Sequence, residues 1–121
     1  MIGLFACSKR PIPDVFSESM AGFRRIAQGE APVSQPPDPI PARDIDQIRT
    51  ASYEGPGKLD VRVYALANSA VALDVVQRWK PAPDTVFFYS DRFVVVIKWQ
   101  SADRKALQAF VGEFEKRFEQ K

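Results

Sequence analysis

The side chains that most small enzymes use for catalysis are scarce in this chain. Its 121 residues include one cysteine, Cys7, and no histidine. A lone cysteine excludes a disulfide within the chain and a cysteine-rich zinc site, and the lack of histidine excludes acid–base schemes that use an imidazole. The sequence also has no glycine-rich phosphate loop, nucleophile elbow or metal-ligand spacing. Any acid–base catalysis would therefore fall to carboxylates.

Two pairs of carboxylates are close enough in sequence to be considered, Asp44 with Asp46 and Glu113 with Glu115. Neither pair lies within a pattern that suggests a pocket. Glu113 precedes Arg117 by four residues, which on a helix is the spacing of a surface ion pair that stabilises by roughly 0.2–0.5 kcal/mol. We therefore expect both pairs to be solvated, and we predict no catalytic residue, no cofactor, no metal and no enzymatic activity.

A cluster of aromatic residues on two predicted neighbouring strands allows two interpretations. Its members are Phe87, Phe88, Tyr89, Phe93 and Trp99. Exposed on an open sheet, such rings would stack on the bases of a single-stranded nucleic acid, whereas more often they form a core. The chain has 17 Lys plus Arg against 15 Asp plus Glu, a net charge of +2, which is too small for the positive field of a dedicated nucleic-acid binder. We favour the core and do not expect nucleic acid as a partner.

The three residues before Cys7 suggest a specific role for this cysteine. Leu4-Phe5-Ala6-Cys7 resembles the lipobox of bacterial lipoproteins, with Leu three positions before the cysteine and Ala directly before it. The resemblance implies that a signal peptidase cuts before Cys7 and that Cys7 is the lipidation site, carrying a diacylglyceryl group. It also implies a place in the bacterial cell envelope, on the periplasmic side, with the membrane as a partner through this lipid anchor.

The motif departs from the usual pattern in two respects. Phe5 is bulkier than the small or β-branched residue usual at that position, and only residues 1–6 precede Cys7, whereas an export signal needs a basic start and an apolar run of about 7–15 residues. The resemblance therefore requires a longer precursor in which Met1 is not the true start. The alternative is that Cys7 is an ordinary free thiol in a cytoplasmic protein that begins at Met1.

Length and composition indicate one folded domain. A chain of 121 residues with 45% hydrophobic, 12% aromatic and 26% charged residues fits a single core. No stretch approaches the roughly 20 apolar residues of a membrane-spanning helix.

Proline sets the N-terminal part of the chain apart, because seven of the ten prolines lie in the first 46 residues. Pro36, Pro37, Pro39 and Pro41 fix φ and remove amide donors, so residues 31–43 should form an extended strap over the domain surface. We divide the chain into a tether or signal remnant, residues 1–13, and one α+β domain, residues 14–121, that includes this strap.

Two structures are open for the segment before the strap. Phe16, Met20, Phe23 and Ile26 recur at helical spacing behind Asp14 as an N-cap. Gly22 interrupts this pattern, and residues 23–28 equally fit a short edge strand. In either case we expect the apolar side chains to pack onto the main body.

Two strand–strand–helix units follow along the chain. In the first, residues 48–54 and 59–66 flank a Gly-Pro-Gly turn, and Asn68 or Ser69 caps a helix that ends at Pro81. In the second, residues 85–89 and 93–99 form the hairpin, and a helix from Ser101 carries a long apolar stripe. That stripe consists of Leu107, Phe110, Val111, Phe114 and Phe118.

The sequence thus predicts an α+β fold in which two consecutive ββα units form a four-stranded, mainly antiparallel sheet with both helices on one face. The reason for a single face is that each helix has only one apolar stripe to bury. For function we expect a non-catalytic, envelope-associated binding or accessory domain that contacts a protein or a small ligand. The alternative is a cytoplasmic regulatory or nucleic-acid-associated module.

Overall fold

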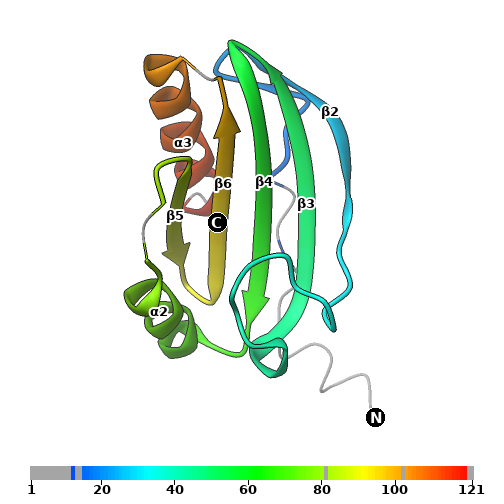
Figure 1. Ribbon diagram of the computed structural model, residues 1–121, viewed down its shortest axis with the longest axis vertical. Coiled ribbons are helices and arrows are strands. Elements are labelled where there is room, and N and C mark those ends of the chain that lie inside the picture. Colours follow the sequence, from blue (N-terminus) through cyan, green and yellow to red (C-terminus); the bar gives the residue numbers. More distant parts are fainter. Residues whose placement is uncertain (1–11, 13–14, 81, 102, 120–121) are drawn as a thin grey trace.

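The described residues form one curled, six-stranded antiparallel sheet and two α-helices (Figure 1). The computed structural model describes residues 12, 15–80, 82–101 and 103–119. The strands are β1 (Ser19–Met20), β2 (Phe23–Glu30), β3 (Ile45–Gly55), β4 (Gly57–Leu66), β5 (Thr85–Ser90) and β6 (Phe93–Gln100). The helices are α2 (Ser69–Arg78) and α3 (Arg104–Glu119), with a short 3-10 helix, η1 (Ala42–Asp44), before β3. The order across the sheet is β1-β2-β3-β4-β6-β5.

The predicted elements of the two ββα units are confirmed, but the predicted assembly is wrong. The four expected strands pair as two hairpins, β3 with β4 and β5 with β6. The sheet has six strands rather than four, because residues 19–30 form the additional strands β1 and β2. The helical interpretation of this segment fails at the turn between them, where Ala21 and Gly22 take φ values of 53° and 87°, outside the helical region.

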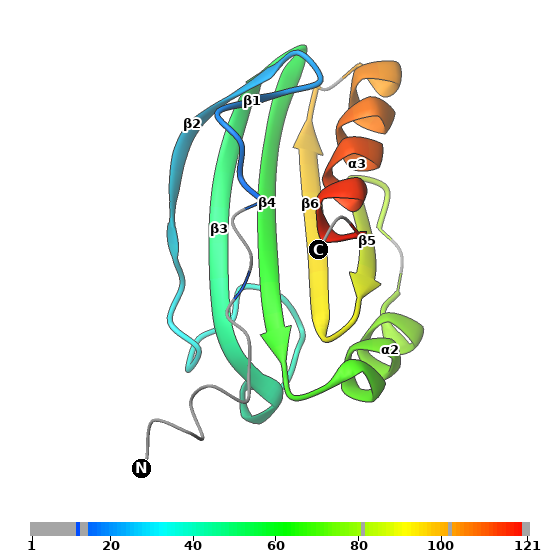
Figure 2. The same ribbon diagram turned by 180° about the vertical axis from the view of Figure 1, so that it is seen from behind.

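The two helices lie on opposite faces of the sheet, which also contradicts the prediction. Successive residues of a strand point to opposite faces. Val61 and Val63 of β4 belong to the apolar cluster that contains Phe110 of α3, whereas Tyr64 belongs to the cluster that contains Ala72 of α2. Figure 2 shows α3 and residues 15–20 lying over the first of these faces, and Figure 1 shows the strap crossing the second, with α2 at the lower end of the sheet beside β5.

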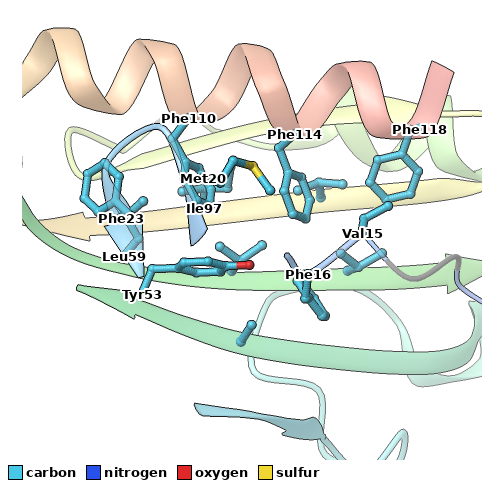
Figure 3. Packing of buried hydrophobic residues seen from close by; sticks show 14 of the residues in the cluster. Val15, Phe16, Met20, Phe23, Tyr53, Leu59, Ile97, Phe110, Phe114 and Phe118 are labelled. Atoms are coloured by element: carbon cyan, nitrogen blue, oxygen red, sulfur yellow. The ribbon is translucent and has the colours of Figure 1, made fainter. Parts of the chain in front are cut away.

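The core of the first face lies between α3 and the sheet, and it is strongly aromatic. Phe110, Phe114 and Phe118 project from α3 toward the strands (Figure 3). The ring of Phe110 meets those of Phe23 and Tyr53 edge to face, with centroids 5.5 Å and 4.9 Å apart. Edge-to-face pairs at these distances are favourable. The stripe predicted for the last helix is therefore the main helical contribution to this core.

The strands define two ends of the molecule, which we call the hairpin end and the strap end. The hairpin end holds the β3–β4 turn at Gly55–Gly57 and, beside it, Gln100 at the end of β6. The strap end holds the paired residues Ile45 and Leu66, together with η1 and α2. Helix α3 starts at the hairpin end, where the backbone N–H of Asp103 donates to the carbonyl oxygen of Pro56 at 2.9 Å.

Candidate functional site

Cys7 and most of the predicted tether lie outside the described residues. The exception is Ile12, which is 4% exposed and belongs to the cluster on the first face. Its backbone N–H donates to Oε1 of Gln47, near the start of β3, at 3.5 Å. The chain is thus fixed to the strap end of the sheet five residues after Cys7.

The two carboxylate pairs considered in the sequence lie in different parts of the fold. Asp46 is the extra residue of a β-bulge between the pairs Ile45–Leu66 and Gln47–Ala65, and its carboxylate bonds to Arg92 at 3.2 Å. Asp44 lies in η1, and both Glu113 and Glu115 are exposed on α3. Glu113 and Glu115 are thus solvated, as expected, whereas Asp46 is engaged by Arg92 and Asp44 is partly buried.

The aromatic cluster is divided between the two faces of the sheet. Phe87 stacks on Trp79 on the second face, with centroids 5.1 Å apart. Phe88 and Phe93 meet Phe118 on the first face, at 6.4 Å and 5.7 Å. Phe93 is buried and Phe87, Phe88 and Trp99 are partly buried against the two apolar clusters, whereas Tyr89 is 40% exposed, so the core interpretation holds for four of the five rings.

One half of the second face, at the hairpin end, carries polar side chains and is covered by neither helix nor the strap (Figure 1). We call it the open face. Adjacent strands contribute Arg24 and Ile26 from β2, Ser52 and Glu54 from β3, Lys58 and Asp60 from β4, and Lys98 and Gln100 from β6. Two adjoining hollows of about 640 and 420 Å³ lie over these residues.

Charges alternate in sign across the open face. Arg24 pairs in register with Glu54, and Glu54 with Lys58, whose Nζ lies 3.9 Å from the Glu54 carboxylate. One row further from the turn, the hydroxyl of Ser52 donates to Asp60 at 2.9 Å, and Asp60 pairs in register with Lys98. Opposite charges directly across strands are mutually stabilising. The surface therefore has a strong local pattern with little net charge.

Ile26 is placed on the open face by a second β-bulge. The register passes from Arg25–Tyr53 to Ala27–Ser52, so Ile26 is the extra residue. A bulge re-aims side chains and is common near functional sites. Ile26 is 52% exposed and lines both hollows, so a large apolar side chain stands in the middle of a charged surface.

The strap is held on the other half of the second face by a buried polar network. Asp38 is 6% exposed, and its carboxylate accepts hydrogen bonds from the Tyr64 hydroxyl and from Nη1 of Arg62, the latter at 3.1 and 3.3 Å. Burial raises the pKa of Tyr64 well above its usual value, and the hydrogen bond to Asp38 raises it further. The hydroxyl therefore remains a protonated donor, and its role is to hold the strap.

A groove of about 840 Å³ separates the strap from α2 at the strap end. Its apolar lining includes Pro39, Pro41, Val71 and Trp79. Its charged lining consists of Arg43, Asp44, Asp74, Arg78 and Lys80, of which Asp74 and Arg78 form an ion pair at 3.2 Å. This groove is more apolar than the open face and lies at the opposite end of the second face.

Sequence reasoning identified neither the open face nor the Asp38 network. The alternation of polar and apolar residues in β3 and β4 was the available signal for one solvated face, but it does not show which part a helix covers. The position of Ile26 depends on a bulge, which has no clear mark in the sequence. Asp38 lies among prolines, and its partners are 24 and 26 residues away.

Three further observations bear on function. Within the described ranges, no helix is long and apolar enough to cross a membrane. In the same part of the chain, no group of three or more His, Cys, Asp or Glu residues is arranged to hold a metal ion. Comparison of the chain with models of protein families, with curated proteins and with solved structures finds no match in any of the three.

Proposed function

We propose that this chain is a non-catalytic binding or accessory domain of the bacterial cell envelope, anchored through a lipid on Cys7, and that its open face contacts a partner protein. The observation that carries the binding role is the open face itself. It joins paired charges, two hollows and the exposed side chain of Ile26 on one surface.

The open face has the composition of a protein-binding surface. An apolar side chain surrounded by polar and charged groups is the usual arrangement at such interfaces. Three cations and three anions line the hollows, namely Arg24, Lys58 and Lys98 with Glu54, Asp60 and Asp84. This balance favours a partner with complementary charges of both signs over nucleic acid, which needs an excess of cations.

The envelope location is supported by the resemblance of residues 4–7 to a lipobox and by Pro11, which suits the end of a tether before the buried Ile12. The mass of the protein purified from the membranes of its native host tests this part of the proposal. We expect a chain that begins at Cys7 and carries a lipid adduct, and a Cys7→Ser variant that lacks the adduct. An unmodified chain in the soluble fraction would favour the cytoplasmic module instead.

The binding role is tested by photocrosslinking in the native host. We would place p-benzoylphenylalanine at position 100 on the open face or, as a matched control, at position 77, where Gln77 is exposed on α2. We expect a discrete crosslinked species from position 100 and none from position 77, and a weaker one when Lys98→Glu is added to the first variant. The same species from both positions, or none from position 100, would contradict the proposal.

A further inference from the structure

The few residues between Cys7 and the folded body limit how far the domain can lie from a membrane to which Cys7 is anchored. Four residues separate Cys7 from Ile12, so their Cα atoms are at most about 18 Å apart even in a fully extended chain. Ile12 is buried and bonded to Gln47. The anchor must therefore lie close to the part of the sheet that Ile12 contacts.

That part of the sheet belongs to the strap end. Gln47 is the third residue of β3, and the turn at the hairpin end begins eight residues later, at Gly55. Eight residues of strand span about 26 Å, which exceeds the reach of the tether. A lipid on Cys7 therefore cannot anchor the domain upright on its hairpin end while Ile12 stays packed.

The side chains at the strap end also suit a membrane surface. The groove at the strap end presents Trp79 beside prolines and valines, and its lining carries three cations, Arg43, Arg78 and Lys80, against two anions, Asp44 and Asp74. Leu73 of α2, at the same end, is 38% exposed. Tryptophan together with long basic side chains is typical of surfaces at the boundary between lipid and water. The hollows of the open face are also lined by a tryptophan, Trp99, but cations and anions are equal in number there.

We infer that the anchored domain stands with its strap end, including η1 and α2, against the lipid headgroups, so that the open face points into the aqueous phase. This inference rests on the lipid anchor of the proposed function and deepens it, because it names the surface that meets the membrane. The partner of the open face is then a soluble protein or the soluble part of a membrane protein.

The orientation is tested with the native tether on vesicles. Cys7 is the only cysteine, so a maleimide lipid couples the full chain at that position through a thioether. We would place p-azidophenylalanine at position 43 in η1 or at position 58 on the open face, attach the same dye to each, and measure quenching by a nitroxide on the lipid headgroups. Arg43 and Lys58 are both exposed, and matched melting temperatures would show that both variants fold.

We expect quenching at position 43 to be several-fold stronger than at position 58, and quenching at both positions to disappear when Cys7 is blocked with N-ethylmaleimide before the vesicles are added. Equal quenching, or stronger quenching at position 58, would overturn the orientation. Failure of the orientation is distinguishable from failure of the anchor, because the mass of the native protein reports on the anchor alone.

Discussion

At the scale of single residues, Tyr64 shows how one buried side chain organises a segment with little regular structure. Its side chain has no exposed surface, and its hydroxyl donates to Asp38 in the middle of the strap. Arg62, one row away on the same face, adds a charge-assisted bond to the same carboxylate. Removal of one partner from such a network is costly because it leaves another buried polar group unsatisfied.

The raised pKa of Tyr64 predicts how stability depends on pH. The folded state holds the phenolic proton more tightly than the unfolded chain, in which tyrosine ionises near pH 10. The contribution of Tyr64 is therefore complete below about pH 10 and is lost as pH rises further, by up to about 1.4 kcal/mol per pH unit. Urea unfolding at pH 9 and pH 11 should show a smaller loss of stability for Tyr64→Phe than for the native chain. An equal loss in both would mean that Tyr64 ionises normally.

At the scale of elements, the β1–β2 turn and the β3–β4 turn are in close backbone contact at the hairpin end. A Cβ atom added at Gly55 would lie 2.5 Å from the carbonyl oxygen of Gly22 and 3.1 Å from Cα of Phe23. These are backbone atoms, so relief requires the β1–β2 turn to move as a whole. Glycine at position 55 therefore allows the two turns to approach this closely.

The contact predicts a large effect from a single methyl group. Gly55→Ala should lower the free energy of unfolding by about 1–3 kcal/mol, because it overpacks the junction of the two turns. Gly112→Ala is the matched control, since Gly112 lies inside α3 with nothing within 4 Å of an added Cβ, and it should raise stability by about 0.5–1 kcal/mol. Urea denaturation measures both. A neutral Gly55→Ala would show that the two turns do not press on each other.

The strands and helices show how much of the fold could be predicted from the sequence. The periods of apolar residues and the caps located four strands and two helices, and Asn68 accepts from the N–H of Val71 as an N-cap should. The faces of the helices could not be predicted, because an apolar stripe indicates that a helix is buried but not against which side of a sheet. The continuous apolar run Phe93–Ile97 required cover on both sides, and the sequence offered no way to assign α2 to one of them.

The additional strands were missed for a related reason. Phe16, Met20 and Phe23 are buried, as expected, whereas Ile26 is 52% exposed and does not pack onto the main body. The spacing of these residues fits a helix as well as a turn between strands. In the fold, residues 23–30 pair with β3, as at Arg24 and Glu54, which are 30 residues apart in sequence, and local spacing does not reveal such pairing. The open face could not be predicted either, because its extent depends on how much of the second face α2 and the strap cover.

At the scale of the whole molecule, the N-terminal segment is part of the fold rather than an addition to it. Residues 15–20 lie over the first face beside α3 (Figure 2). The Tyr53 hydroxyl donates to the carbonyl oxygen of Ser17 at 2.8 Å, and Arg25 bonds to that of Phe16. The position of the boundary between tether and domain therefore determines how far the chain can be shortened without loss of stability.

This arrangement predicts where shortening becomes harmful. Removal of residues 1–11 should leave the melting temperature nearly unchanged, whereas the same truncation with Ile12→Ala should cost about 2 kcal/mol, because Ile12 is 4% exposed in the main core. Thermal unfolding of the two truncated chains makes the comparison. A marked loss on removing residues 1–11 alone would show that those residues contribute to the fold.

The bulge at Ile26 bears on which changes of chain length the molecule tolerates. Arg25 pairs with Tyr53 and Ala27 with Ser52, so deletion of Ile26 would join these pairs into one unbroken ladder. Elsewhere in a strand, loss of one residue turns every later side chain to the wrong side of the sheet. Position 26 is therefore a point at which evolution can lengthen or shorten β2 while all other pairings are kept, adding or removing an apolar contact in a single step.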